Sequence, residues 1–141
     1  MPEPVIICLH QPALELAEKV ASLCDGEVHG LQSRVKTIPE TFEKTKEHLQ
    51  DLFQKGHPLV GICSSGILIR SLADVLSDKH TEPPVLAVAE DGSCVIPLLG
   101  GHHGANELAR KIASGLGVVA AVTTAGDLKF GIALDQPPED L

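Results

Sequence analysis

A glycine-rich loop at residues 100–106 (Gly-Gly-His-His-Gly-Ala-Asn) holds the residue types in this sequence that are best suited to chemistry. It follows an apolar run and precedes a segment with helical periodicity, so it should lead from a strand into a helix. A helix start carries unpaired N–H groups and a partial positive charge, and glycines let a ligand approach the main chain. His102 and His103 add hydrogen-bond donors and proton carriers. The loop is therefore predicted to bind an anion.

Other interpretations of this loop stay open. The glycines could serve only a tight turn, with Asn106 helping to cap the helix and both histidines in solvent. No metal site is predicted, because two adjacent histidines seldom reach one ion and no carboxylate is suitably spaced. The loop matches neither G-x-G-x-x-G nor G-x-x-x-x-G-K-[ST], which disfavours a generic nucleotide-binding protein. No cofactor is predicted.

Two further polar segments follow predicted strands. Residues 123–127 (Thr-Thr-Ala-Gly-Asp) could bind polar substituents or simply form a turn. The turn at 64–66 (Ser-Ser-Gly), with Arg70 one helical turn later, could bind an anion, although a serine cap and a surface charge explain it equally well.

The elements that must position these residues alternate between strands and helices. The second helix should begin with a capping box at residues 37–40 (Thr-Ile-Pro-Glu) and carry Phe42 on its apolar face. The third should carry Leu68, Leu72, Val75 and Leu76 on one side, and the fourth should end at Gly115 or Gly117. Strands are predicted at 4–9, 28–35, 59–63, 85–89, 94–99 and 118–123, and helices after Pro12, after residues 37–40, after Gly66 and after Gly104.

The dipeptide Asp91-Gly92 favours a tight hairpin, so the strands on either side of it should be antiparallel. A helical crossover then makes the strand at 118–123 parallel to the strand at 94–99. The glycine loop, the Thr123-Thr124 turn and residues 79–84 should therefore share one edge of the sheet. Ser65 and Arg70 should lie at the opposite edge.

Composition indicates an α/β fold. The 141 residues are 43% hydrophobic but only 2% aromatic, so the core must be aliphatic. We expect three layers, with helices on both faces of a mixed, mainly parallel sheet. Residues 1–134 are predicted to form a single domain, and residues 135–141 to begin a proline-rich linker to a downstream domain.

The net charge of −8 argues against binding to nucleic acid or to an anionic membrane, since both require basic surface. No apolar run reaches the roughly 18 residues that span a bilayer, and the start lacks a basic signal sequence, so a cytoplasmic location is expected. The four cysteines are far apart and are predicted to be small buried side chains.

Taken together, several segments resemble a known family. Residues 66–70, 95–109 and 123–127, with Lys79 and the pair Glu82-Pro83, resemble the N-terminal half of the cobalamin-biosynthesis protein CbiG, the cobalt-precorrin-5A hydrolase. The resemblance is specific over about 59–135. The usual hydrolase loop resembles Gly-His-x-Gly-Gly-Ala-Asn, so this chain has one glycine fewer between His102 and Asn106. The family also has Asp-Pro after the lysine, where this chain has Glu82-Pro83.

The match is closer to CbiG-like domains fused ahead of a precorrin-3B C17-methyltransferase. Those resemble Gly-Gly-His-x-Gly-Ala-Asn and continue as Phe-Gly-x-Ala-Leu-Asp-x-Pro-Pro, as residues 130–138 do here. A covalently or functionally linked methyltransferase domain is accordingly an expected partner. Homodimerisation is left open.

The resemblance implies a corrin-ring biosynthesis domain that binds a precorrin or cobalt-precorrin intermediate. The family's hydrolase opens the ring-A δ-lactone and releases acetaldehyde; a noncatalytic binding module attached to the methyltransferase is the alternative. Lactone opening needs donors for the oxyanion and a base for the attacking water, a role assigned to His102. The expected substrate-binding residues are Ser65, Arg70, Lys79, Gly100, Gly101, His103, Gly104, Asn106, Thr123 and Thr124.

Overall fold

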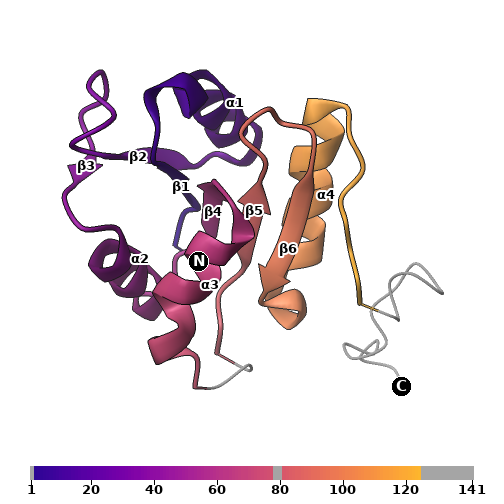
Figure 1. Cartoon of the computed structure of the whole chain (residues 1–141). Coiled ribbons are helices and arrows are strands. Elements are labelled where there is room, and N and C mark those ends of the chain that lie inside the picture. Colours follow the sequence, from indigo (N-terminus) through magenta and orange to yellow (C-terminus); the bar gives the residue numbers. More distant parts are fainter. Residues whose placement is uncertain (1, 78–80, 125–141) are drawn as a thin grey trace.

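The computed structural model describes residues 2–77 and 81–124, except for the side chain of His102, and shows a sheet between two layers of helices (Figure 1). Its strands are β1 (Val5–Cys8), β2 (Glu27–Leu31), β3 (Thr41–Phe42), β4 (Leu59–Ile62), β5 (Val85–Val88) and β6 (Val95–Leu99). Its α-helices are α1 (Leu14–Cys24), α2 (Thr45–Gln54), α3 (Ser65–Leu72) and α4 (Ala105–Leu116). Short 3₁₀ turns are η1 (Gln11–Ala13), η2 (Ala73–Val75) and η3 (Gly101–His103).

The six strands lie in the order β3-β2-β1-β4-β5-β6. Every residue of β1, β4 and β5 is buried, as expected for parallel strands covered on both faces. All neighbouring strands are parallel except β5 and β6, which pair antiparallel through the turn at Asp91-Gly92. The predicted mixed, mainly parallel sheet and its hairpin are confirmed.

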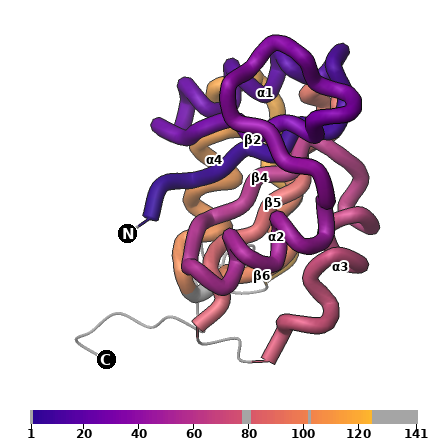
Figure 2. The backbone as a smooth tube through the Cα atoms, turned by 90° about the vertical axis from the view of Figure 1, so that its left-hand side faces the viewer, coloured from indigo at the N-terminus to yellow at the C-terminus, as the bar shows by residue number. Residues whose placement is uncertain are grey.

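Helices cover both faces of the sheet because alternate strand residues point to opposite sides. Ile6 and Cys8 of β1 pack in a cluster with α1 and α4, whereas Val5 and Ile7 pack in a second cluster with α2 and α3. Figure 2, which faces the end of the sheet where β3 and β2 lie, shows α1 above β2 and α2 below it. The predicted three-layer architecture is therefore confirmed.

The capping box predicted at residues 37–40 is wrong. Residues 41–42 form β3, which pairs in parallel with Gly30 and Leu31 of β2, and α2 begins only at Thr45 after Lys44. The backbone explains the difference, since Gly30 N–H donates to the Glu40 carbonyl at 2.9 Å and holds this segment extended. Phe42 is buried beside Leu49 as the pattern predicted, but from a strand.

The strand predicted at 118–123 and the helical position of Leu76 also need correction. Residues 118–123 make a single parallel bridge, between Ala120 and Val95. The segment therefore runs parallel to β6 as predicted, but it does not form the predicted strand. α3 ends at Leu72 and tightens into η2, and Leu76 after it is extended and 38% exposed. Of the two glycines proposed to close the fourth helix, Gly117 does so with a φ of +73°.

Among the described residues, none of the helices has both the length and the apolar composition needed to cross a bilayer.

Candidate functional site

The glycine loop turns the chain from β6 into α4 through two left-handed residues. Gly100 has a φ of +79° and Gly104, the N-cap of α4, has a φ of +95°, a region that side chains with a Cβ rarely occupy. Gly100 is also tightly enclosed, because a Cβ there would lie 2.6 Å from the Pro83 carbonyl oxygen. The loop therefore requires glycine for its own backbone path and for contact with the segment before β5.

Asn106 ties this loop to the segment after α4. Its side chain is buried, and its Nδ2 donates a hydrogen bond of 3.2 Å to Thr124 Oγ1. On the other side of the loop, the Cβ position of Gly101 lies 3.9 Å from the same oxygen. Asn106 follows the N-cap and so does not cap the helix. The predicted meeting of the glycine loop, Thr124 and the residues before β5 at one sheet edge is confirmed for the part of each segment that the structure describes.

We expect Thr124→Val to lower the free energy of unfolding by about 1 kcal/mol, because it keeps the side-chain volume but removes the hydroxyl that Asn106 contacts. The matched control is Thr123→Val, since Thr123 is exposed one position earlier. Chemical denaturation of both variants measures the difference. Equal loss in the two variants would contradict a specific role for the bond.

A cavity of about 550 Å³ lies beside the loop, at the edge where β1, β4 and β5 begin. His103 is one of the residues that line it, and its Nε2 is buried without a hydrogen-bond partner among the described residues. Three carboxylates line the cavity, and Lys and Arg are absent from its described lining. The cavity is lined by Pro2, Glu3, Pro4, Cys24, Asp25, Pro58, Pro84, His103, Gly104, Glu107 and Leu108.

The charges divide the loop into two sides. Glu107, in the first turn of α4, faces the cavity and interacts favourably with the helix dipole. A carboxylate ligand would be repelled on that side. The side facing Gly101 and Thr124 has hydroxyl and amide groups instead, and is better suited to an anion.

Not all the predicted site residues come together. Ser65 begins α3 at the edge where β4 ends, opposite the glycine loop, as the hairpin topology predicted. The Arg70 guanidinium folds back over Gly66, whose Cβ position lies 3.0 Å from its nitrogen, so Ser65 and Arg70 share that opposite edge. Lys79, the His102 side chain, and residues 125–141, including the predicted linker, lie outside the described residues.

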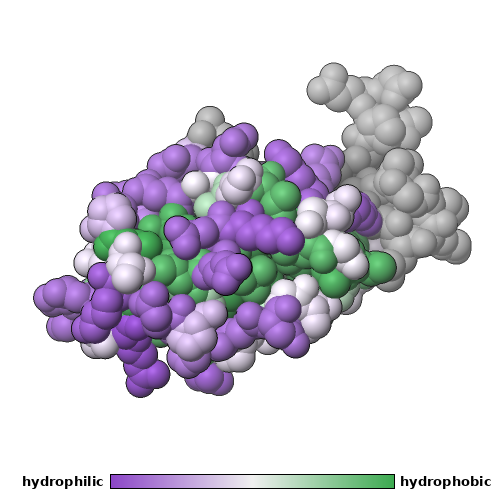
Figure 3. Space-filling model, turned by 90° about the horizontal axis from the view of Figure 1, so that it is seen from above, coloured by the Kyte–Doolittle hydropathy of each residue, from purple (hydrophilic) through white to green (hydrophobic). Residues whose placement is uncertain are grey.

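A second pocket, of about 280 Å³, opens at this opposite edge, and the sequence analysis did not identify it. It lies between the ends of β1 and β4, where the chain order of the sheet reverses direction, a place where α/β proteins commonly bind ligands. Seen from above, on the side where the β5–β6 hairpin turns, hydrophobic surface runs between hydrophilic side chains (Figure 3). The pocket is lined by Leu9, His10, Leu31, Arg34, Cys63, Ile67 and Glu90.

The polar groups that line this second pocket do not form a reactive site. His10 Nδ1 lies 3.6 Å from Glu90 Oε2, and both side chains are about half exposed. Burial, with Glu90 adding a smaller effect, raises the pKa of the Cys63 thiol to about 11. Cys63 therefore stays protonated at neutral pH, so it lines the pocket as an apolar side chain and does not act as a nucleophile.

Comparisons with known proteins relate the sequence that contains the glycine loop to proteins of cobalamin synthesis. The family model described as "Cobalamin synthesis G N-terminal" matches residues 47–127, which include the glycine loop and Thr124. The cobalt-precorrin-5A hydrolase of Priestia megaterium is 40% identical over 88 residues, covering 62% of this chain and 24% of that protein. The enzyme of the same name from Salmonella typhimurium is 44% identical over 78 residues, covering 55% and 22%. The matches thus span about a quarter of the hydrolases' length.

The fold also has a relative among solved structures. The crystal structure of a cobalamin biosynthesis protein G homolog from Sulfolobus solfataricus aligns with a TM-score of 0.64 at 19% identity, over 86% of this chain and 36% of that one. At this identity the likeness establishes the fold alone.

Proposed function

Because the chain belongs to the cobalamin synthesis G N-terminal family, we propose that it binds a precorrin or cobalt-precorrin intermediate at the glycine loop and opens its ring-A lactone. The observation that carries the proposal is the hydrogen bond between Asn106 and Thr124. It brings together two motifs that both lie within the family match, which supports a single site.

The chemistry of lactone opening fits the described side of the loop. A water must attack the lactone carbonyl, the carbonyl oxygen gains negative charge, and the ring C–O bond then breaks to leave a carboxylate and an alkoxide. The alkoxide then collapses to acetaldehyde as its C–C bond to the macrocycle breaks, and the macrocycle takes up that electron pair and the proton that the base had accepted. The start of α4 supplies backbone dipoles for that charge, and His102 is the proposed base that accepts the proton of the water. The substrate's carboxylates would lie on the Gly101 and Thr124 side, away from Glu107, with Lys79 as the proposed cation.

A second candidate is a noncatalytic module that holds the intermediate for a linked methyltransferase. It is favoured by the sequence itself, which has one glycine fewer than the usual hydrolase loop and continues at 130–138 as the fused domains do. Residues 1–134 would then be the binding domain, and residues 135–141 the beginning of the linker.

One experiment separates these functions. The folded chain is mixed with cobalt-precorrin-5A, acetaldehyde is measured with a coupled dehydrogenase, and binding is followed from the corrinoid absorbance. We expect saturable binding and acetaldehyde release. Binding without release would assign the module function instead, and no binding would contradict both proposals.

A further inference from the structure

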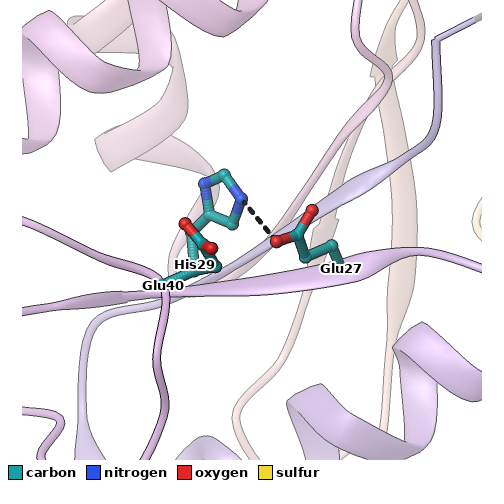
Figure 4. A group of neighbouring side chains, drawn as sticks. All are labelled: Glu27, His29 and Glu40. Carbon is teal, nitrogen blue, oxygen red and sulfur yellow. Dashed lines mark ion pairs between the residues drawn. The ribbon is translucent and has the colours of Figure 1, made fainter.

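A histidine and two glutamates converge where β2 pairs with the edge strand β3, at the far end of the strand order from β6, which leads into the glycine loop. Glu27 and His29 are alternate residues of β2, so their side chains leave the same face of the strand. Glu40 is the residue immediately before β3, which pairs in parallel with β2. One ligand-type atom from each residue lies within 4.8 Å of the other two. Figure 4 shows the three side chains turned toward one another.

The spacing of these atoms suits an ion better than a direct contact. His29 Nε2 lies 3.8 Å from Glu27 Oε1, which is too long for a hydrogen bond. Two ligands of a tetrahedral Zn²⁺ ion, each bound at about 2.0–2.2 Å, lie about 3.3–3.6 Å apart. A small adjustment of the side chains would therefore place both atoms on one metal.

The other nitrogen of His29 already has the partner that a metal-binding histidine needs. His29 Nδ1 lies 2.8 Å from His48 Nε2 on α2, and the His48 ring is stacked on Phe42 with centroids 4.5 Å apart. When Nδ1–H donates to His48, the lone pair of Nε2 is left free for an ion. Only 14% of the His29 side chain is exposed, so this orientation is held by packing.

The charge around His29 also favours a cation. Glu3 lies within hydrogen-bonding reach of Glu27 and adds a third carboxylate next to it. Three carboxylates within one small region repel one another unless a proton or a cation lies between them. Glu3 is thus a group that could supply a fourth ligand.

From these contacts we infer that Glu27, His29 and Glu40 form a site for a divalent transition-metal ion of the Zn²⁺ type. An imidazole with carboxylates selects such an ion over Mg²⁺, which prefers oxygen ligands and water. The three ligands precede the family-matched residues 47–127, so the inference does not rest on the proposed corrinoid function. A bound ion would link β2, the segment before the two-residue β3 and, through Glu3, the N-terminal segment.

The test measures Zn²⁺ binding to metal-free folded chain by competition with a chromophoric chelator, with Mg²⁺ as the comparison ion. We expect one equivalent of Zn²⁺ to bind, and His29→Ala to lower the affinity by about 100-fold or more. Glu40→Gln should lower it at least about 10-fold without disturbing the fold, because Glu40 is exposed. His48→Ala, which removes the hydrogen bond behind the ligand together with the ring stacked on Phe42, should lower it about 10-fold.

Two matched variants control for charge and for histidine number. Glu15→Gln removes one exposed carboxylate from α1, and His10→Ala removes a histidine from the opposite edge; both should leave the affinity unchanged. Zn²⁺ should also raise the melting temperature of the unmodified chain by more than that of Glu40→Gln at the same Zn²⁺ concentration. Absence of saturable binding, or equal affinity in the unmodified chain and Glu40→Gln, would overturn the inference.

Discussion

Gly100→Ala is expected to lower the free energy of unfolding by about 3 kcal/mol. Alanine in the left-handed region costs about 1–2 kcal/mol, and forcing an extra carbon into packed surroundings costs about 1–3 kcal/mol more. Gly100 has both problems, because its φ is +79° and its Cβ would lie 2.6 Å from the Pro83 carbonyl oxygen. Since the obstacle is backbone, neither side can move without shifting the loop or the entry to β5. Urea denaturation of purified protein measures the loss.

Gly117→Ala is the matched control for this experiment. Its φ of +73° is nearly that of Gly100, but no atom lies within 4 Å of its Cβ position. Gly117→Ala should therefore cost only the backbone strain, about 1–2 kcal/mol. If both variants lose the same stability, the close approach of Gly100 to Pro83 contributes nothing to the fold.

His102→Ala should lower the rate of acetaldehyde release by about 10²–10⁴-fold, because a positioned general base contributes about that much to proton transfer. Circular dichroism should show that the fold survives. The measurement is kcat and KM with cobalt-precorrin-5A, in parallel with the corrinoid-binding titration.

The neighbouring histidine provides the comparison. His103 lines the cavity beside the loop but is not the proposed base, so His103→Ala should raise KM and leave kcat within a few-fold. The reverse pattern, with kcat lost only in His103→Ala, would transfer the role of base to His103. An unchanged kcat in His102→Ala would show that His102 is not the general base.

Much of the fold could be predicted because its strongest signals are local. The runs that became β1, β4 and β5 are continuously apolar, which matches strands buried on both faces. The Asp91-Gly92 turn predicted the one antiparallel pairing, and from it the meeting of the glycine loop with Thr124. These inferences needed only short-range patterns and the handedness of crossovers.

The failures arise where pairing overrides a local pattern. Residues 37–40 have the spacing of a capping box, yet hydrogen bonds from β2 hold the segment extended as it enters β3. A two-residue strand leaves almost no periodicity to detect. The cluster around His29 was missed for the same reason, since Glu40 reaches it only through that pairing. The alternation of Glu27 and His29 on one strand face was the available signal.

The hairpin between β5 and β6 also affects the order in which the chain can fold. Its two strands are joined through residues 89–94 alone, so their pairing closes a short loop at low entropic cost. β1 instead pairs with β4, and Val5 and Leu59, which face each other in that pair, are separated in the sequence by α1, β2, β3 and α2. Because long-range parallel pairing is slow, the β5–β6 edge that leads into the glycine loop is expected to form before the centre of the sheet closes.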